Sequence, residues 1–431
     1  MTAPSNPASS NPAPSTLDLT VTGFANGGAG VAHADDGRVV FVAGALPGER
    51  VRARIDEQKA AFARAVTLEV LDASPHRIDP SCPASAAGAG CCDLSYVSAE
   101  YARELHAGVL ADVLTRLGRF GPDDPAPAAP TVTALGPDAD GWRVRTRLAV
   151  GADGAVGLRE RGSSDLITTP CVAPVDGLLA GAAALGAVPG SELVLAMGSD
   201  GRRHAAQLSP VARPRRGGRR ASAQRARHSA GRDRTTRVLE GDGAVTQTVG
   251  GHTWSIPVTG FWQAHRSAPA TYAETVRRYV GAVDGLPAGL RVWDLYGGAG
   301  VLGAGLLDGA LPVAHIDLVE TDPGALAAAA DALGDAPVTA HRGDSAAVIG
   351  GLSTPDVVIV DPPRRGAGAA VVAAIAAAQP RAVVHVGCDA AAFARDLRDY
   401  VTHGYRVTAW QGFDAFPRTR HMEAIALLES P

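Results

Sequence analysis

Residues 292–303 constrain the fold more than any other stretch, and they read Val-Trp-Asp-Leu-Tyr-Gly-Gly-Ala-Gly-Val-Leu-Gly. Apolar residues that end in closely spaced glycines predict a buried strand, a tight turn and the start of a helix. About twenty residues later, the segment from His315 to Glu320 predicts a second strand that ends in a carboxylate. In α/β sheets this order binds an adenosine-containing cofactor, because the glycines let the backbone approach the ligand and the acid accepts hydrogen bonds from the ribose.

Other interpretations of the glycine loop remain open at this point. The spacing Gly298-x-Gly300-x-x-Gly303 also fits the dinucleotide fingerprint, so an NAD-dependent oxidoreductase is an alternative. A glycine-rich turn that binds nothing is the third and least favoured interpretation. The loop alone does not decide between the first two.

Length and composition limit the class of protein. A chain of 431 residues is long enough for two or three domains with their own cores. With 46% hydrophobic residues and no apolar run of about 20 residues, a globular protein without a membrane partner is expected. Residues 1–16 are rich in Ala, Pro, Ser and Asn, which predicts a disordered tail and not a signal peptide. Five cysteines do not make a disulfide framework in a chain of this size, which predicts a reducing, cytoplasmic location.

Positive charge is concentrated in one segment. The net charge is only −4, yet residues 201–240 contain 12 arginines and two acids, Asp233 and Glu240. A basic segment on an otherwise acidic chain predicts contact with a polyanion. Because the segment has few apolar residues, we expect a mobile loop in the absence of that partner. A solvated loop without any partner is the alternative.

The N-terminal half predicts strands and one helix. Residues 17–75 alternate apolar and polar side chains between glycine and proline turns, which predicts a small β-barrel. Such barrels often bind oligonucleotides, and a purely structural barrel is the alternative. Ser98 is expected to cap a helix over 98–117, whose apolar residues recur every fourth position. Residues 76–257 otherwise predict a mostly β central domain that contains the basic segment.

From residue 258 onward, strand and helix patterns alternate. Ser267 and Pro269 predict the start of a helix. The predicted strands cover 290–296, 313–320, 338–344, 356–361, 382–387, 406–413 and 421–428. This pattern predicts an α/β domain with a parallel, doubly wound sheet and an antiparallel pair at its C-terminal end.

Three chemical signals stand at or just beyond predicted strand ends, where ligands bind in such sheets. Asp361 is followed by two prolines, and the resulting rigid rim could face a flat aromatic substrate. Cys388 follows a strand and can be a nucleophile if its pKa is lowered. Glu423 is a carboxylate beside basic residues and suits a general base. Each signal alone is more often structural, but their joint occurrence in this order favours chemistry.

Together these motifs resemble those of the S-adenosylmethionine-dependent RNA 5-methyluridine methyltransferase family. The segments that carry the resemblance are Phe261-Trp262-Gln263, Asp294-Leu295-Tyr296-Gly297-Gly298-Ala299-Gly300, Glu320, Asp344, Asp361-Pro362-Pro363-Arg364, Gly387-Cys388-Asp389 and Phe416-Pro417-x-Thr419-x-His421-x-Glu423. The barrel, with Val40 to Glu49, looks like the family's TRAM domain, an RNA-binding module. The resemblance covers nearly the whole chain from residue 17. It also disfavours the oxidoreductase, which needs none of the last three motifs.

The resemblance implies a fold and a mechanism. The fold would be a Rossmann-like class I methyltransferase domain over 258–431, preceded by an OB-like TRAM barrel and the central domain. Cys388 would add to C6 of uracil, C5 would take the methyl group, and Glu423 would remove the C5 proton. Asp361 is expected near the base and the reacting atoms. The implied contacts to S-adenosylmethionine are Gln263, Asp294, Tyr296, Gly298, Gly300, Glu320, Asp344 and Asp361.

Four further thiols lie outside the catalytic region, at Cys82, Cys91, Cys92 and Cys171. Cysteine thiolates bind iron–sulfur clusters, but two adjacent cysteines are a poor spacing, so zinc or plain buried thiols are alternatives. In the family's pattern Cys82, Cys92 and Cys171 match three ligand positions, and the remaining one falls on Ala89. The resemblance therefore implies a 4Fe–4S cluster in which Cys91 substitutes for that ligand.

The implied partner is RNA, and the family serves both transfer RNA and large-subunit ribosomal RNA. The barrel and the arginines would hold the RNA, and the target base must leave its stack to reach the catalytic pocket. A non-catalytic RNA-binding or RNA-folding factor on the same fold is the alternative, and intact Cys388 and Glu423 argue against it. We expect a monomer.

Overall fold

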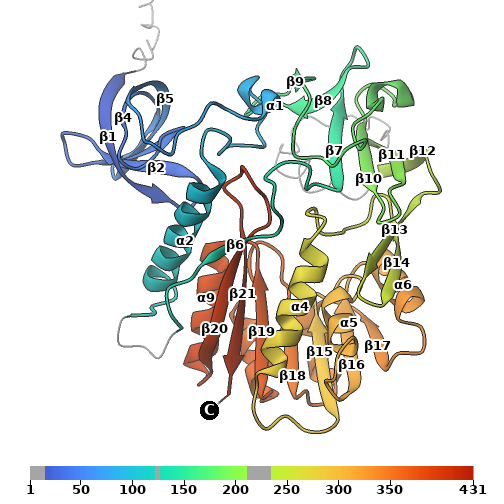
Figure 1. Cartoon of the computed structure of the whole chain (residues 1–431). Helices are drawn as coiled ribbons and strands as arrows, with labels where there is room; N and C mark the ends of the chain where they lie inside the picture. The colour runs from blue at the N-terminus through green and yellow to red at the C-terminus, as the bar shows by residue number, and fades with distance from the viewer. Residues whose placement is uncertain (1–14, 122–126, 211–233, 431) are drawn as a thin grey trace, which may run out of the picture.

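The structure, a computed structural model, describes residues 15–121, 127–210 and 234–430 (Figure 1). A closed β-barrel comes first, followed by a short helical segment, a mostly β central part and a large α/β domain that contains the C-terminal half of the chain. No helix in these three ranges is long and apolar enough to cross a lipid bilayer.

The N-terminal barrel closes in the strand order β1-β2-β3-β5-β4. Its strands are β1 (Thr16–Ala25), β2 (Ala29–His33), β3 (Val39–Ala43), β4 (Arg50–Gln58) and β5 (Phe62–Asp72). Alternation decides which side chains enter: along β4, Val51 and Ala53 are buried whereas Arg50 and Arg52 are not. The predicted barrel is confirmed. Its first strand already begins at Thr16, and the expected N-terminal tail lies outside the described residues before it.

The segment after the barrel carries α1 (Pro83–Ala86) and α2 (Ala99–Arg116). Helix α2 packs Val109, Leu110 and Val113 into the core of the α/β domain. Ser98 stands at the N-terminus of α2, but its side chain makes no capping hydrogen bond. The helix and the N-cap position of Ser98 are therefore as predicted, but the expected side-chain cap is absent.

The central part is built on a six-stranded sheet in the order β12-β11-β10-β7-β8-β9. Its elements are β7 (Arg145–Val150), β8 (Val156–Arg159), β9 (Leu166–Ile167), β10 (Glu192–Met197), β11 (Arg203–Pro210), β12 (Arg234–Glu240) and the 3-10 helix η1 (Ala182–Leu185). Strands β11 and β12 are the two ends of the arginine-rich segment, and Arg203 forms an ion pair with Glu240 at 2.6 Å. The predicted mobile loop between them falls on 211–233, outside the described residues.

The α/β domain contains an eight-stranded sheet in the order β17-β16-β15-β18-β19-β21-β20-β6. Its strands are β6 (Val132–Ala134), β15 (Leu290–Leu295), β16 (Val313–Glu320), β17 (Val338–Arg342), β18 (Val357–Val360), β19 (Ala382–Gly387), β20 (Arg406–Asp414) and β21 (Glu423–Glu429). Strand β21 is antiparallel to both of its neighbours, β19 and β20. The predicted doubly wound sheet with an antiparallel pair at its C-terminal end is confirmed.

Helices cover both faces of this sheet. They are α4 (Ala268–Gly281), α5 (Val301–Leu307), α6 (Pro323–Leu333), α7 (Ser345–Val348), η2 (Ile349–Gly351), α8 (Ala369–Ala377) and α9 (Ala390–Thr402). All four residues of β18 are buried, and they alternate between the two faces. Val358 and Val360 join the core beneath α2, α8 and α9, whereas Val357 and Ile359 join the core beneath α4 and α5. A fully apolar strand is therefore what a sheet buried on both faces requires.

Two pieces of the central segment pack on the α/β domain. Strand β6 extends the sheet by pairing in parallel with β20. The hairpin of β13 (Ala244–Val249) and β14 (His252–Pro257) lies against α6, and its Trp254 is buried beside Leu318 and Ala329. The periodicity of so short a strand as β6 gave no signal of this pairing.

Candidate active site and thiol cluster

Strand register brings Cys388, Glu423 and Asp361 to one edge of the sheet. Gly387 pairs with Ala424 across the antiparallel strands β19 and β21. Cys388, which follows Gly387, and Glu423, which precedes Ala424, are therefore neighbours. On the other side of β19, strand β18 ends at Val360, which pairs with β19, and Asp361 follows Val360 in the chain. The three residues that the sequence singled out therefore converge at the carboxyl ends of the parallel strands.

Burial and mutual repulsion set the charge states of these three groups. Burial, with repulsion from Asp361, raises the pKa of Glu423 well above its usual value, and its side chain is almost inaccessible. Burial raises the pKa of Asp361 to about 7. Burial, and then the charges of Glu423 and Asp361, raise the pKa of the Cys388 thiol to about 12. In the protein alone, the Cys388 thiol and the Glu423 carboxyl group thus favour their neutral forms near pH 7, whereas Asp361 is about half ionised.

Two further residues act on this site that the sequence had not singled out as functional. Arg364 is the cation that lowers the pKa of both Cys388 and Glu423, so its positive charge acts on both groups. Tyr272, on α4, is fully buried, its pKa is raised by burial and by the nearby acids, and its hydroxyl has no hydrogen-bond partner among the described residues. Arg364 belongs to the quoted Asp-Pro-Pro-Arg motif and could have been found there, whereas Tyr272 looked like an ordinary core residue.

The glycine loop between β15 and α5 presents its backbone to open space. Tyr296, Gly298 and Gly300 all adopt left-handed backbone angles, with φ of 57°, 57° and 77°. A side chain added at Gly298 would meet no atom within 4 Å, so this part of the loop is accessible to a ligand. Glu320, at the end of β16, accepts a hydrogen bond from the Gly298 amide at 3.1 Å. The loop and the acid therefore form the cradle that an adenosine ligand requires.

Asp294 lies beneath this loop and not on its open side. The side chain is completely buried, and one carboxylate oxygen accepts the Gly303 amide at 3.1 Å. A Cβ atom at Gly297 or at Gly303 would stand 2.8 Å from this carboxyl group. Burial raises the pKa of Asp294 to about 7. Asp294 thus holds the turn in shape, which explains why glycine stands at both positions.

The other predicted cofactor contacts surround the same loop. Asp344 is exposed just beyond β17, and its carboxylate accepts a hydrogen bond from the Ala346 amide at 3.0 Å. Burial is the main cause that raises the pKa of Tyr296, and the charge of Asp344 adds to it. Gln263 follows Trp262, which packs on Trp254 at 5.8 Å between ring centres. The Trp254 indole in turn donates to a carbonyl of the glycine loop, at Ala299, over 2.8 Å.

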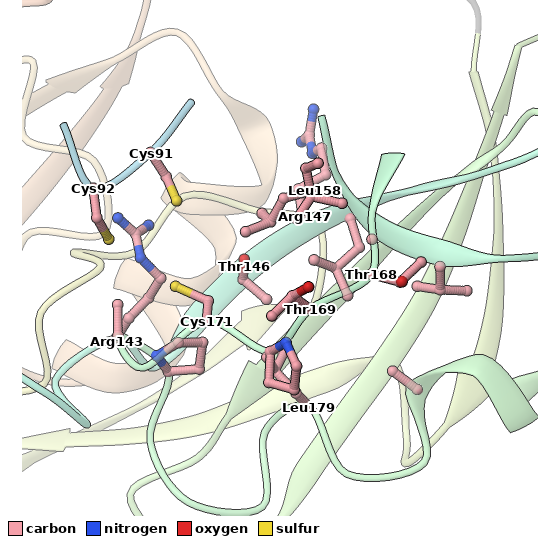
Figure 2. A pocket seen from close by; sticks show the side chains of 18 of the residues that line it. Cys91, Cys92, Arg143, Thr146, Arg147, Leu158, Thr168, Thr169, Cys171 and Leu179 are labelled. Atoms are coloured by element: carbon pink, nitrogen blue, oxygen red, sulfur yellow. The ribbon is translucent and has the colours of Figure 1, made fainter. Parts of the chain in front are cut away.

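A second site gathers the four remaining cysteines. The sulfur atoms of Cys82, Cys92 and Cys171 all lie within 4.8 Å of one another, and those of Cys82 and Cys171 are 4.0 Å apart. Figure 2 shows the sulfur of Cys91 beside those of Cys92 and Cys171. Hydrogen bonds with Cys171 and Cys92 lower the pKa of Cys91 to about 3 and also lower the pKa of Cys82. Contacts among the same sulfur atoms raise the pKa of Cys92 and of Cys171, so two of the four thiols favour the thiolate, which is the metal-binding form of cysteine, and two favour the protonated form.

The thiol cluster borders a cavity and a cation. The guanidinium of Arg143 stacks on Trp142 at 4.5 Å, and the nearby cysteines oppose the lowering of its pKa by burial. A cavity of about 540 Å³ extends from Cys91, Cys92 and Cys171 along the central sheet (Figure 2). Sulfur atoms about 3.8 Å apart fit one tetrahedral ion with bonds of about 2.3 Å. A cluster needs a wider spacing, for which the adjoining cavity has room. Ala89, at the family's usual ligand position, is buried beside these thiols.

The fold and the site together define an S-adenosylmethionine-dependent RNA methyltransferase. Residues 15–68 match the family model described as TRAM domain, and residues 353–430 match the model described as tRNA (Uracil-5-)-methyltransferase. The chain belongs to the S-adenosylmethionine-dependent RNA 5-methyluridine methyltransferase family. This membership decides against the NAD-dependent oxidoreductase.

Full-length relatives support the assignment. An uncharacterized RNA methyltransferase of Corynebacterium efficiens is 43% identical over 419 residues, which is 96% of this chain and 94% of the relative. The 23S rRNA (uracil(1939)-C(5))-methyltransferase RlmD of Alkalilimnicola ehrlichii is 31% identical, with 96% of each chain covered. The crystal structure of the Pyrococcus abyssi tRNA (uracil-54, C5)-methyltransferase in complex with S-adenosyl-L-homocysteine superimposes with a TM-score of 0.68. It is 18% identical, with 96% of this chain and all of that chain covered, and it shows the shared fold.

Proposed function

We propose that this protein methylates C5 of a uridine in RNA through a covalent bond between Cys388 and C6 of the base. The observation that carries the proposal is the register of β19 and β21, which makes Cys388 and Glu423 neighbours, with Asp361 at the end of the adjacent strand. A nucleophile and a buried carboxyl group on the same edge of a sheet can act on the two adjacent carbons of one flat base.

The chain's residues would act in a fixed order. Cys388 loses its proton to solvent, and its sulfur forms a bond to C6, which moves the electrons of the C5–C6 double bond into an enolate. C5 would then bond to the methyl carbon as the bond from that carbon to the sulfonium sulfur breaks and leaves its electron pair on the sulfur. Glu423 removes the proton that C5 still carries, the C5–C6 double bond reforms, and the electron pair of the S–C6 bond returns to Cys388 as it leaves. The Arg364 cation favours both the thiolate and the ionised carboxylate, because it lowers both pKa values.

S-adenosylmethionine, when bound, supplies the methyl group from a sulfonium centre. The backbone of the glycine loop would contact the cofactor at Gly298 and Gly300, and Glu320 would accept hydrogen bonds from the ribose of the cofactor. The residues fit this role, because the Gly298 side of the loop is open and Glu320 already bonds the Gly298 amide. The further proposed contacts are Tyr296, Asp344, Gln263 and Asp361, whereas Asp294 acts by supporting the loop from below.

The mechanism is tested with two variants and one substrate analogue. RNA that carries 5-fluorouridine should form a covalent complex with the wild type, because fluorine at C5 blocks proton removal. Cys388→Ala should form none and should still bind the cofactor. Glu423→Gln should accumulate methylated RNA that is covalently attached to the protein, since only the last step is lost. Release of free 5-methyluridine at the wild-type rate by either variant would refute the mechanism.

We propose ribosomal RNA, and not transfer RNA, as the substrate. The relative that is named as a 23S ribosomal RNA enzyme aligns along 96% of both chains at 31% identity. Incubation with radiolabelled cofactor and separated RNA classes, followed by nucleoside analysis, tests this choice. Label confined to transfer RNA would refute it. We further propose a monomer, since one chain supplies the nucleophile, the base and the cofactor loop.

We propose that the four clustered thiols hold an iron–sulfur cluster, with Cys91 as the fourth ligand. The support is an all-sulfur donor set, in which the pKa values of Cys82 and Cys91 are lowered, beside a cavity with room for the cluster. Protein purified without oxygen should be brown and contain iron and sulfide. Zinc without iron would assign the site to a single ion, as the 4.0 Å spacing of Cys82 and Cys171 would allow.

A further inference from the structure

The loop over 415–422 joins β20 to β21 and ends one residue before Glu423. In Figure 1 this red loop rises above the sheet towards the barrel and the central β sheet. Its internal hydrogen bonds form one small turn: the Thr419 amide and hydroxyl both donate to the Phe416 carbonyl, and the Thr419 hydroxyl accepts the His421 amide. The direction in which the loop leaves the sheet must therefore be set by contacts with other parts of the protein.

Arg418 makes several of these contacts. Its φ angle is 65°, a left-handed conformation that costs a non-glycine residue free energy unless its surroundings enforce it. Its carbonyl accepts the Leu94 amide at 2.9 Å. Its guanidinium, which is largely buried, donates to the Asp140 carboxylate at 2.7 Å and to the Ser81 hydroxyl. The segment after the barrel and the central segment thus both form hydrogen bonds with Arg418.

Arg420 extends the same bracing to the barrel. Its amide donates to the Asp93 carboxylate at 3.1 Å, and its guanidinium lies 3.6 Å from that carboxylate. It also reaches the Gly27 carbonyl at 3.4 Å, while Gly28 lies so close to its stem that a side chain there would collide with it. Asp93 directly follows Cys92 of the thiol cluster, so the residue that contacts the loop is adjacent in sequence to a clustered cysteine.

We infer that Arg418 is a positioning residue for Glu423, and that Ser81, Leu94 and Asp140 act through it on proton removal from C5. The inference rests on the proposed function, because it takes Glu423 to be the base. Four residues separate Arg418 from Glu423 along a loop with few hydrogen bonds of its own, so release of Arg418 lets the loop and the start of β21 move. Glu423 directly follows this loop as the first residue of β21, so a movement of the loop reaches its carboxylate along the chain, whereas Cys388 follows β19 and is not part of the loop.

The consequence is step-specific. Addition of Cys388 and transfer of the methyl group need the sheet edge and the glycine loop, neither of which Arg418 contacts. Only the final step needs the carboxylate within hydrogen-bond reach of the C5 proton. A misplacement of about 1 Å can slow such a step by about a hundredfold. Loss of the Arg418 contacts should therefore leave methylated RNA attached to the protein, as is expected for loss of the base Glu423 itself.

The test uses the full chain and single-turnover reactions in which methyl transfer and RNA release are measured separately. Arg418→Gly removes the side chain while accepting the left-handed backbone, Arg418→Lys keeps a cation, and Asp140→Asn weakens only the ion pair. Methyl transfer should stay within about threefold of wild type, while release should fall by about tenfold to a hundredfold in Arg418→Gly. Arg418→Lys should recover part of the loss. Arg406→Gly, at the exposed opposite end of β20, is the matched control and should behave like wild type.

The outcomes separate the two hypotheses. If Glu423→Gln accumulates the covalent product but Arg418→Gly and Asp140→Asn release RNA like the Arg406→Gly control, the positioning role is refuted and the mechanism stands. If Glu423→Gln accumulates nothing, the base assignment itself fails. If Arg418→Gly does not fold, Asp140→Asn decides the question, since an amide keeps a hydrogen-bond acceptor at that position. Equal slowing of both steps in the folded variants would also refute the positioning role.

Discussion

Cys388 should react slowly with alkylating agents in the protein alone, because its surroundings disfavour the thiolate. The pKa of its thiol is about 12, raised from 9.0 by burial and by the charges of Glu423 and Asp361. At pH 8 this gives about a thousandfold less thiolate than an unperturbed thiol has, since each pH unit is a factor of about ten. A more basic thiolate is also more nucleophilic, which returns roughly 15- to 30-fold. The expected net effect is alkylation that is roughly 30- to 60-fold slower than for a free cysteine peptide.

The assay is timed reaction with iodoacetamide, followed by digestion and mass spectrometry of the peptide that contains Cys388. The rate should rise about tenfold for each pH unit between about pH 7 and 10, because only the thiolate reacts. Asp361→Asn removes a charge that raises the pKa, so it should speed the reaction. Arg364→Gln removes the cation that lowers the pKa, so it should slow the reaction. Changes of opposite sign separate electrostatics from simple access to the pocket.

A rate at pH 8 that equals or exceeds that of the free peptide would refute the reasoning, because the thiol would then be active before any substrate binds. The cofactor offers an internal check. S-adenosylmethionine carries a positive sulfonium and should speed alkylation, whereas S-adenosylhomocysteine, which lacks this charge, should not. An equal effect of both ligands would show that they change access to Cys388 and not its charge state.

Three further predictions follow from buried groups. Glu49→Ala should lower the free energy of unfolding, measured with urea, by about 3–5 kcal/mol, because Glu49 is fully buried and its loss leaves Arg77, now 2.6 Å away, without its counter-charge. Gly297→Ala should abolish cofactor binding in calorimetry, since its Cβ would stand 2.8 Å from the Asp294 carboxyl group. Burial raises the pKa of Asp396, but the buried His385 imidazole, 3.4 Å away, and hydrogen bonds from two backbone amides outweigh this, and the pKa is lowered overall. Its stabilisation is therefore present above the unfolded pKa near 4 and lost as the pH falls, so Asp396→Asn should flatten the acid side of the stability profile.

Local patterns predicted the elements that carry chemistry. The run Val357 to Val360 is buried on both faces, and such runs are apolar throughout, so its period and its end at Asp361 can be read directly. Cys388 and the glycine loop were found for the same reason, since each follows a strand with a strong signal. The adjacency of Cys388 and Glu423 was not contained in either segment, because it depends on which strands pair and in which register.

Long-range contacts explain what the sequence left open. The adjacent cysteines looked like a poor metal site because spacing along the chain was the only guide. In the fold, Cys171 approaches from the central segment and meets Cys82 at 4.0 Å. The bond from the Arg420 amide to Asp93 likewise joins residues far apart in sequence. No periodicity or motif signals such a contact, since neither partner needs any particular neighbour to make it.

The charge state of Cys388 and the bracing of the loop before Glu423 bear on the same problem. An exposed thiolate would be open to oxidation and alkylation whenever RNA is absent. Here the thiol is kept neutral by burial and nearby acids. The loop that ends at Glu423 is held by Gly27 of the barrel, Asp93 of the thiol segment and Asp140 of the central segment. If RNA binds across these parts, a shift in any of them reaches the carboxylate through Arg418 or Arg420. The accessory domains would then affect the rate of the last chemical step as well as the affinity for RNA, and the single-turnover experiment on Arg418→Gly separates the last step from methyl transfer.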